Sequence, residues 1–251
     1  MNAAQAPDAA RVPYADVANC STLFPGLAPA QAARAAKEAG WDLVEFWWPF
    51  ADPAPADAEL SAFADALGEA GVRLVAVNMW GGDMAAGERG VLHRSDLPAG
   101  HFDAVLRLHE LTGVPRGNLL PGAGGPEVLD DQRRRLSAVA RALDGAFMPM
   151  LEPLSGNPSL PVRDPWHAAD LAAETGCGVL LDFFHLAELG TDVERWLDDV
   201  RGGAVPLPDH VQVADSPGRG APGTGTAPLD RWVADLRGAG YDGHVAAEWN
   251  G

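Results

Sequence analysis

Short apolar runs alternate along this chain with longer segments in which apolar residues recur every three or four positions. The short runs have the length of strands, and they span residues 17–24, 43–48, 73–79, 117–120, 148–154, 179–184, 210–214 and 244–249. The longer segments are predicted to be helices at residues 29–39, 57–70, 101–112, 127–143, 164–175, 192–201 and 228–239. Strand and helix in strict alternation indicate a parallel sheet with right-handed crossovers.

Eight strands in a chain of 251 residues favour an α/β fold in which the sheet closes as one (β/α)8 TIM barrel. We expect residues 1–12 to form a flexible, Ala-rich leader and residues 13–251 to form the single barrel domain. The fourth strand is short and is interrupted by Pro121, and no helical segment follows the eighth strand. The barrel is therefore expected to lack its last outer helix. The leader, or a partner subunit of a homo-oligomer, would then cover that side unless it stays exposed.

The composition narrows the class of partner. The net charge of −17 argues against nucleic acid, because phosphates are bound by clustered Lys and Arg. Cys20 and Cys177 lie far apart in the chain, so no disulfide framework is indicated and a reducing cytoplasm fits. The first residues do not resemble a secretory signal, and no apolar stretch approaches the roughly 20 residues of a membrane span. We expect a cytoplasmic protein whose partner is a small-molecule substrate, with no nucleic acid and no membrane.

Four strand-like runs in the second half of the chain carry a side chain able to bind a metal ion at or near their ends. These side chains are Glu152, Asp182, Gln212 and Glu248, separated by 30, 30 and 36 residues, about one strand plus one helix each time. A parallel barrel brings the carboxyl ends of its strands together at one mouth, where such barrels hold their chemistry. One Glu at a strand end is more often a surface residue. Four candidate ligands at matching strand positions favour a metal site, because a carboxylate buried in an apolar strand needs a partner that offsets the cost of its desolvation.

This set offers only oxygen atoms, which suits one divalent cation such as Mg²⁺ or Mn²⁺ better than zinc. His185 follows Asp182 in the segment DFFH and can reach the same pocket, and Arg219 stands in the Gly- and Pro-rich loop DSPGRGAPGTG. A lone His is more often structural, and a loop Arg is as often solvated as functional. Beside a metal site we favour substrate binding for both, with Arg219 contacting a substrate carboxylate or oxyanion.

The loop after the third strand reads NMWGGDMAAGERG and is rich in glycine. These glycines would let the loop fold over the mouth as a lid, and Asn78 and Arg89 within it are further candidates for substrate binding. Trp47, Trp48 and Trp80 could wall the pocket, although aromatic residues at strand ends are more often core. The chain has no P-loop, no Gly-x-Ser-x-Gly, no CxxC pair and no HExxH, which argues against a serine hydrolase, a thiol redox enzyme and a zincin.

A set of segments in fixed order resembles a known family. VEFWWPF, NMWGGDMAAGERG, MLEPLS, LLDFFH, HVQVADSPGR, PGTG and AGYDGHVAAEW are similar to hydroxypyruvate isomerase and its close relatives in the xylose isomerase-like barrel superfamily. The resemblance runs from about Asn19 to Trp249 and is carried most by the GDMAAGERG loop together with QVADSPGR and PGTG. Two positions of residues 215–228, which we call the mouth loop, depart from the family pattern: Thr226 stands where an acidic residue is usual, and Gly220 where a His is common.

The resemblance implies a metal-dependent isomerase of the aldose-ketose type. Its catalytic acid/base pair would be Glu152 and Glu248, and both would also bind the divalent ion together with Asp182 and Gln212. The remaining substrate contacts that it implies are His185, Arg219 and Arg89. The reaction would convert hydroxypyruvate to tartronate semialdehyde, or isomerise a four-carbon 2-oxo acid sugar, through an enediolate.

Other functions stay open at this point. A ketose 3-epimerase would use the same metal on a longer, neutral polyol and would not need a carboxylate-binding Arg219. A non-catalytic barrel that binds a sugar acid belongs to another class of protein, and the presence of all four ligands argues against it. A nuclease of the endonuclease IV type shares the barrel, but it needs several additional His ligands, and the acidic charge disfavours DNA.

Overall fold

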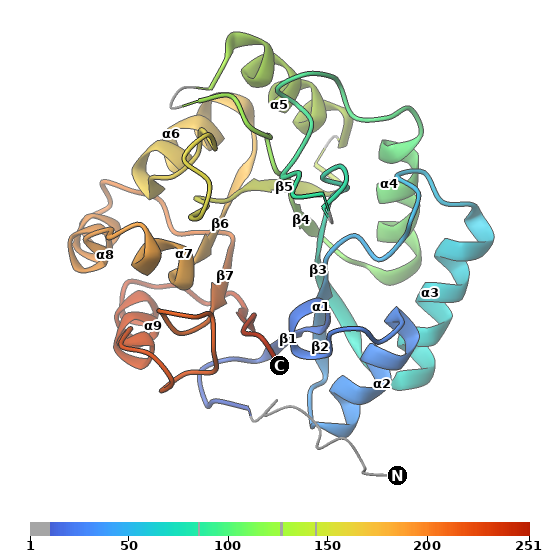
Figure 1. Cartoon of the computed structure of the whole chain (residues 1–251), viewed down its shortest axis with the longest axis horizontal. Helices are drawn as coiled ribbons and strands as arrows, with labels where there is room; N and C mark the ends of the chain where they lie inside the picture. The colour runs from blue at the N-terminus through green and yellow to red at the C-terminus, as the bar shows by residue number, and fades with distance from the viewer. Residues whose placement is uncertain (1–10, 85, 126–127, 144) are drawn as a thin grey trace.

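The computed structural model describes residues 11–84, 86–125, 128–143 and 145–251. In this part of the chain, eight parallel strands pair in sequence order and close a barrel, because β1 pairs with both β2 and β8 (Figure 1). The strands are β1 (Val17–Asn19), β2 (Leu43–Phe46), β3 (Arg73–Asn78), β4 (Arg116–Asn118), β5 (Met148–Leu151), β6 (Gly178–Asp182), β7 (His210–Val213) and β8 (Val245–Ala247). The predicted fold class is confirmed.

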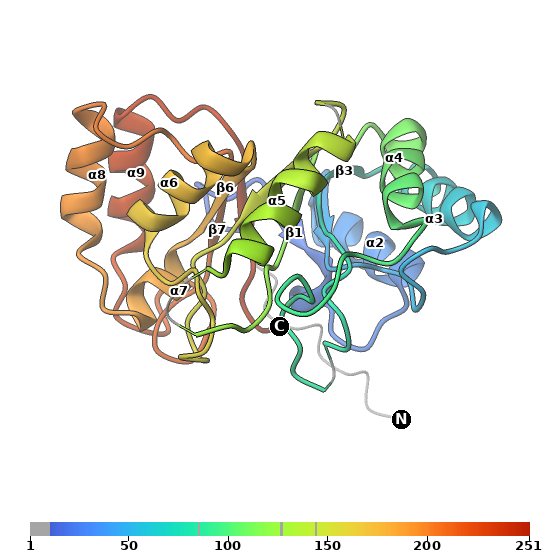
Figure 2. The same cartoon turned by 90° about the horizontal axis from the view of Figure 1, so that it is seen from above.

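Helices form an outer layer around the strands (Figure 1; Figure 2). They are α1 (Cys20–Leu23), α2 (Pro29–Glu38), α3 (Asp57–Ala70), α4 (His101–Thr112), α5 (Asp130–Leu143), α6 (Pro165–Thr175), α7 (Phe183–Glu188), α8 (Val193–Arg201) and α9 (Leu229–Gly238). Their ends follow local chemistry: at α3, the Glu59 carboxylate accepts the N–H of Ala56 at 3.0 Å, and Gly71 ends the helix in the left-handed region. The predicted start of α5 at Glu127 lies outside the described residues. None of the described helices has the length and apolar character needed to cross a membrane.

The first and sixth apolar runs were predicted as strands throughout, and this is wrong for their last residues. Each run leaves the sheet early and continues as a short helix, α1 or α7. The last strand residue caps the helix in both cases: Asn19 accepts the N–H of Ser21 at 3.0 Å, and Asp182 accepts the N–H of Phe184 at 2.9 Å. Periodicity could not separate the two states, because both halves of each run are largely buried.

The fourth strand is short, as the sequence indicates. Gly117 in β4 pairs with Val77 in β3, and a Cβ atom at Gly117 would lie 2.5 Å from the Val77 carbonyl oxygen and 2.6 Å from the Phe147 ring. Only glycine allows this close approach. The barrel therefore closes through β4 even though this strand contributes few residues.

No helix follows β8 in residues 248–251, and the N-terminal segment 11–16 takes the side of the barrel between α9 and α2 (Figure 1). Arg11 donates to the Gly40 carbonyl at 2.8 Å, and Tyr14 packs against the core. Asp16 accepts the N–H of Val245 at 2.9 Å, which ties this segment to β8. Chain N-terminal to β1 therefore covers the side that the missing outer helix would cover.

The last residues of the chain lie at the mouth of the barrel. Asn250 N–H donates to the Arg219 carbonyl at 2.8 Å, and Gly251 N–H donates to the Thr22 carbonyl at 3.0 Å. These bonds join the end of the chain to the loop that follows β7 and to α1, which follows β1.

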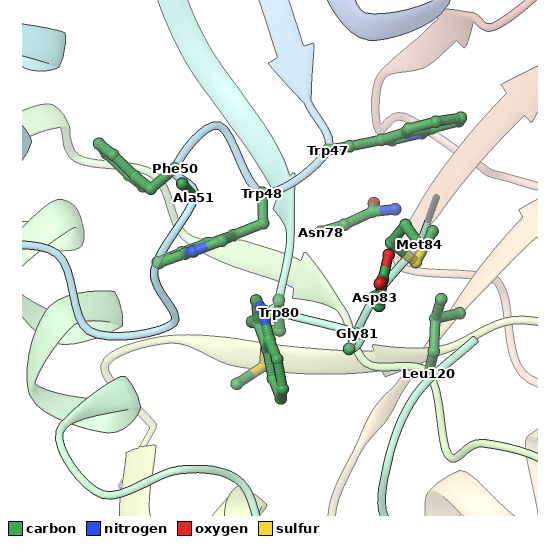
Figure 3. A pocket seen from close by; sticks show the side chains of 12 residues that line it. Trp47, Trp48, Phe50, Ala51, Asn78, Trp80, Gly81, Asp83, Met84 and Leu120 are labelled. Atoms are coloured by element: carbon green, nitrogen blue, oxygen red, sulfur yellow. The ribbon is translucent and has the colours of Figure 1, made fainter. Parts of the chain in front are cut away.

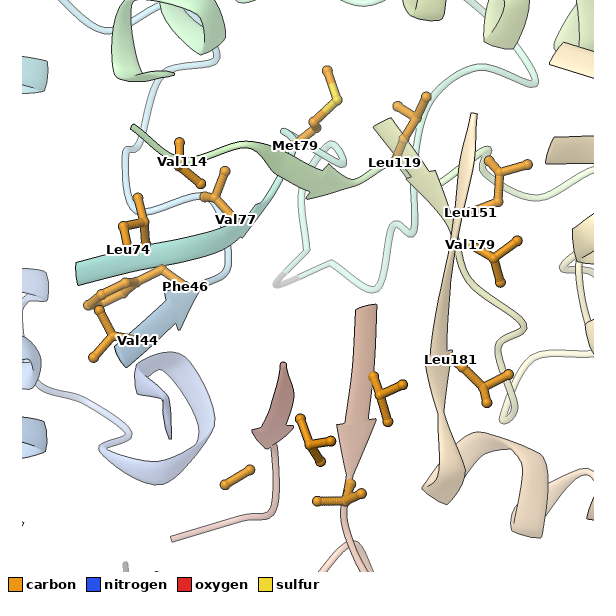
Figure 4. Close-up of a cluster of buried hydrophobic side chains, with 14 of the residues drawn as sticks. Val44, Phe46, Leu74, Val77, Met79, Val114, Leu119, Leu151, Val179 and Leu181 are labelled. Atoms are coloured by element: carbon orange, nitrogen blue, oxygen red, sulfur yellow. The ribbon is translucent and has the colours of Figure 1, made fainter. Parts of the chain in front are cut away.

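The apolar core lies mainly between the strands and the helices, as Figure 4 shows for side chains such as Leu74 and Val77 of β3. Inside the barrel the apolar cluster is small and consists of Val17, Val75 and Ala246. Toward the carboxyl ends of the strands, the buried interior side chains are polar or charged. Buried charge is costly unless it is compensated, so this end of the interior is where a site is expected.

Candidate functional site

The four side chains predicted as metal ligands are all brought into the barrel interior. Glu152 follows the last residue of β5, Asp182 ends β6, Gln212 lies in β7 opposite Asp182 in the strand register, and Glu248 follows β8. Their exposed fractions are 4%, 0%, 2% and 4%. Barrel closure explains the meeting, because it places strands that are distant in sequence around one interior.

Arg219 is the cation at the centre of this cluster. Its Nη2 donates to Asp182 Oδ2 at 3.0 Å and to Glu248 Oε2 at 2.5 Å, and its Nε donates to the Glu248 carbonyl at 3.2 Å. The guanidinium also lies over the Phe184 ring, 4.7 Å from its centroid. Arg219 lines the cavity as predicted for a substrate contact, and in this conformation its charge is paired with two of the predicted ligands.

His185 lies closer to the predicted ligands than the sequence indicated. Its Nε2 is 3.6 Å from Glu152 Oε1 and 3.7 Å from Asp182 Oδ2, and its Nδ1 is 2.7 Å from Ser155 Oγ. One ligand atom from each of Glu152, Asp182 and His185 falls within 4.8 Å of the others, a spacing that could hold one metal ion. With an imidazole within reach, the cluster is no longer limited to oxygen donors, and its donors suit several divalent ions.

Burial dominates the electrostatics of the cluster. It raises the pKa of Glu152 well above its usual range, with the Glu248 and Asp182 carboxylates adding to the effect. It also raises the pKa of Glu248, to about 8, although Arg219 opposes part of this shift. Burial lowers the pKa of His185 to about 4. Three carboxyl groups thus surround one guanidinium, and a divalent cation would compensate the remaining negative charge.

Gln212 supplies the clearest sign that the cluster fits a cation. Its Nε2 donates to Glu45 Oε1 at 2.6 Å, and this bond fixes the orientation of the amide. The other amide atom, Oε1, is buried and has no hydrogen-bond partner in the described part of the chain. A buried carbonyl oxygen without a donor is costly, and a metal ion would satisfy it. The donor set therefore fits a divalent cation without specifying which one.

Several side chains that hold the cluster in place were missed at the sequence level. Asn19 Nδ2 donates to both Glu45 Oε1 and Glu248 Oε1, at 2.9 Å each, and Trp47 Nε1 donates to Glu248 Oε1 at 3.1 Å. Asn118 Nδ2 donates to Glu152 Oε2 at 2.5 Å. Glu45 could have been found by the criterion that singled out Glu152, because it is a carboxylate inside the apolar run LVEFWW. The two asparagines gave no such signal, and Trp47 was considered only as a possible wall of the pocket.

A cavity of about 680 Å³ opens above the cluster and is lined by both glutamates, His185 and Arg219. Asn78 and Arg89, the remaining predicted substrate contacts, also line it. Arg89 Nη1 donates to the Glu88 carbonyl at 2.8 Å, which holds its charge at the wall of the cavity. The glycine-rich loop after β3 forms part of this wall, closed at its base by a hydrogen bond from Gly90 N–H to the Gly81 carbonyl.

The two departures in the mouth loop have a local explanation. The carboxylate of Asp215 accepts N–H groups from Gly223 and Ala227, which folds the loop tightly after β7. A Cβ atom at Gly220 would lie 2.3 Å from Thr224 Oγ1, so a larger residue there would displace this side chain. Thr226 bonds within the loop, through its N–H and its hydroxyl group, to the Ser216 carbonyl. Neither departure removes one of the four predicted ligands.

Known proteins resemble the chain over nearly its whole length. A family profile described as xylose isomerase-like TIM barrel matches residues 33–251. The "Putative hydroxypyruvate isomerase" of Streptomyces coelicolor is 33% identical over 252 residues, covering 92% of this chain and 88% of that protein. The 2-oxo-tetronate isomerase of Pectobacterium atrosepticum is 27% identical, covering 93% and 90%. The crystal structure of an AP endonuclease, family 2, from Brucella melitensis superposes with a TM-score of 0.79 at 25% identity, covering 95% and 93%.

Proposed function

The chain belongs to the xylose isomerase-like TIM barrel family, within the branch that contains the hydroxypyruvate isomerases, and we propose that it is a metal-dependent isomerase of small hydroxy-oxo acids. Its reaction would convert hydroxypyruvate to tartronate semialdehyde or isomerise a four-carbon 2-oxo acid sugar. The observation that carries this proposal is the pair of buried glutamates, Glu152 and Glu248, which line one cavity together with Arg219 and His185.

The metal ion would be held by Glu152, Asp182, Gln212 and Glu248, with His185 within reach as a further ligand. When bound, a divalent cation polarises a substrate carbonyl and stabilises negative charge that develops on its oxygen. Mg²⁺ and Mn²⁺ are the ions we favour, because carboxylate and amide oxygens make up most of the set.

The two glutamates would move the proton. One carboxylate takes the proton from the hydroxyl-bearing carbon beside the ketone, and a proton returns to the former ketone carbon from the other glutamate or from the first. The hydroxyl proton moves to the former carbonyl oxygen, so the product is an isomer and no redox partner is required. Donors fix both groups: Asn118 holds Glu152, while Asn19, Trp47 and Arg219 hold Glu248. Burial raises the pKa of both carboxyls, which suits groups that must gain and lose a proton near neutral pH.

The substrate carboxylate would meet the cationic side of the cavity. Arg89 lines the wall of the cavity and bonds no acidic side chain among the described residues. His185 and Arg219 lie beside the reacting groups. A planar guanidinium binds a carboxylate through two parallel hydrogen bonds, which would orient the carbon chain toward the glutamates.

The decisive experiment is proton exchange in D₂O. The chelated protein is incubated with hydroxypyruvate, then with added Mg²⁺ or Mn²⁺, and followed by proton NMR. Metal-dependent deuterium incorporation with formation of tartronate semialdehyde is expected. Exchange with ketoses alone would favour a ketose 3-epimerase instead, and tight binding of sugar acids without any exchange would favour a non-catalytic barrel.

A further inference from the structure

A second cavity, of about 390 Å³, adjoins the one that holds the two glutamates. It lies between the loop after β2 and the loop after β3, and the two cavities share Trp47, Asn78, Met84 and Leu120 in their walls. The shared residues place the two spaces side by side. We call this second space the aromatic cavity.

The walls of the aromatic cavity are held in place by a buried histidine. His101 Nδ1 lies 2.7 Å from the Pro53 carbonyl, and its Nε2 accepts the N–H of Trp80 at 3.2 Å, so it joins the loops after β2 and β3. The Trp48 ring packs edge-on against His101, with centroids 4.7 Å apart, and its Nε1 donates to the Asp52 carbonyl at 2.9 Å. An empty space with fixed walls is the usual form of a binding site.

The lining selects for a particular chemistry. Figure 3 shows the indoles of Trp48 and Trp80 on one side of the space and Asn78, Asp83 and Met84 on the other. Among the described residues that line it there is no Lys or Arg, and Asp83 adds a negative charge. An anionic group is therefore disfavoured. A hydroxylated carbon chain fits, because its C–H faces pack on aromatic rings while its hydroxyl groups bond the amide and the carboxylate.

The two cavities together give the ligand a direction. Arg89 and Arg219 belong to the larger cavity, so the acid group lies there, and Trp47 connects the reacting carboxylate of Glu248 to the aromatic cavity through its Nε1 bond of 3.1 Å. Carbon atoms beyond the reacting pair would pass Trp47 and enter the aromatic space. A three-carbon acid has no such atoms and would leave this space to water.

We propose that the aromatic cavity is a subsite for the neutral, hydroxylated tail of a sugar acid of about five or six carbons, because such an acid carries two or three carbon atoms beyond the carboxylate and the reacting pair that can enter this space. This inference rests on the proposed isomerase function and names its substrate class. The tail takes no part in bond breaking. Its contacts bind and orient the substrate, so that affinity gained at Trp48 and Trp80 positions the reacting carbons at the glutamates.

The test compares kcat/KM for hydroxypyruvate, a four-carbon and a six-carbon 2-oxo sugar acid. We expect the six-carbon acid to exceed hydroxypyruvate by at least about tenfold, and this ratio to fall about tenfold in Trp80→Ala and in Ala51→Trp. Ala51 is an exposed residue of the cavity wall, so Ala51→Trp fills the space without removing a core side chain. Trp166→Ala, on α6 and outside both cavities, should leave the ratio unchanged.

Two results would overturn the subsite: a wild-type preference for the three-carbon acid, or the same ratio in all variants. Failure of the isomerase function would look different, because no substrate would then exchange its carbon-bound proton. In that case, calorimetric titration with the six-carbon acid decides. Binding that Ala51→Trp weakens supports the subsite without catalysis, and no binding to the wild type removes it.

Discussion

Two clusters of buried polar side chains lie in the same barrel interior, one around the single carboxylate of Glu45 and one around three carboxyl groups, and their surroundings differ. In the inner cluster, Glu45 is bonded by Asn19, Gln212 and His210, so that both of its oxygens have partners. In the mouth cluster, Arg219 donates to Asp182 and Glu248, while the third carboxyl group, that of Glu152, lies 3.6 Å from His185 Nε2. The Glu45 carboxylate therefore has protein donors on both of its oxygens, whereas the mouth cluster has three carboxyl groups for one guanidinium.

This difference distinguishes a buried carboxylate that stabilises the fold from carboxylates that are available for a reaction. A buried carboxylate that accepts hydrogen bonds from amide and imidazole donors on both oxygens contributes to the specificity of the fold and has little need of a further ligand. A group of carboxylates short of cations favours protons or a metal ion, and its protonation state can change during a reaction. Gln212 belongs to both clusters, because its Nε2 serves the inner one while its Oε1 lacks a partner.

The largest effect is expected from Glu248→Gln in the mouth cluster. The amide has nearly the same shape but cannot take a proton, so turnover should fall by roughly a thousandfold or more while the fold is kept. Deuterium exchange measures the first effect and thermal melting the second. The matched control is Glu194→Gln on α8, where the carboxylate pairs with Arg231 at the surface and should be dispensable. A fully active Glu248→Gln protein would refute the two-glutamate mechanism.

Metal addition should act on the mouth cluster alone. An ion that binds only the folded chain stabilises it by about 2.7 kcal/mol at a concentration one hundred times its Kd. Denaturant unfolding of the chelated protein with and without Mn²⁺ measures this gain. In Asp182→Asn most of it should disappear, since one charged ligand is lost. An equal gain in the variant and the wild type would mean that the ion binds elsewhere.

Glu45→Gln tests how far the inner cluster serves the outer one. The Glu45 carboxylate can only accept, so it forces the Gln212 amide to donate and turns its Oε1 away. With an amide at position 45 this control is lost, and we expect Mn²⁺ affinity to fall by about 10- to 100-fold. The paired exchange Glu45→Gln with Gln212→Glu restores one donor facing one carboxylate and should recover binding. Calorimetric titration measures the Kd for Mn²⁺ of both variants. An unchanged Kd in Glu45→Gln would show that the inner cluster does not influence metal binding at the mouth cluster.

The smallest effect is a pH dependence of the metal-free protein. Burial raises the pKa of Glu248 from its ordinary value of 4.5 to about 8, so the folded state holds a proton that the unfolded state releases between these values. The free energy of unfolding should therefore fall as pH rises through this window, with a loss of roughly a few degrees in Tm. Bound metal should flatten the profile, whereas Glu248→Gln should remove only the part due to Glu248, because burial also raises the pKa of Glu152. A chelated protein that gains stability from pH 5 to pH 8 would contradict the assignment.

The elements that follow simple local rules could be predicted from the sequence. The helix at 57–70 agrees with α3 and the helix at 101–112 with α4, because capping residues and glycine mark their ends. The apolar runs around Asn19 and Asp182 were misjudged beyond these residues, because burial is equal in strand and helix there. Local patterns do not report where the backbone turns when both sides of the turn are apolar.

The residues of the candidate site also divide into those that the sequence could predict and those that it could not. Spacing along the chain predicted that the four candidate ligands would meet at the ends of the strands, because the repeat of strand and helix is regular. It could not reveal that Arg219 would reach back to Glu248, or that Asn19 would lie between two carboxylates, since these contacts depend on barrel closure and side-chain direction. Glu45 was within reach of sequence reasoning, because a charge inside an apolar strand always needs a partner.

The position of Gly251 has a practical consequence for anyone who handles this protein. Its N–H is bonded to the Thr22 carbonyl, and Asn250 lines the cavity beside the two glutamates. Any residues that follow Gly251, natural or added as an affinity tag or a fluorescent reporter, would leave the barrel beside this cavity. A label attached there would report on cavity occupancy, whereas purification handles for kinetic work belong at the opposite terminus.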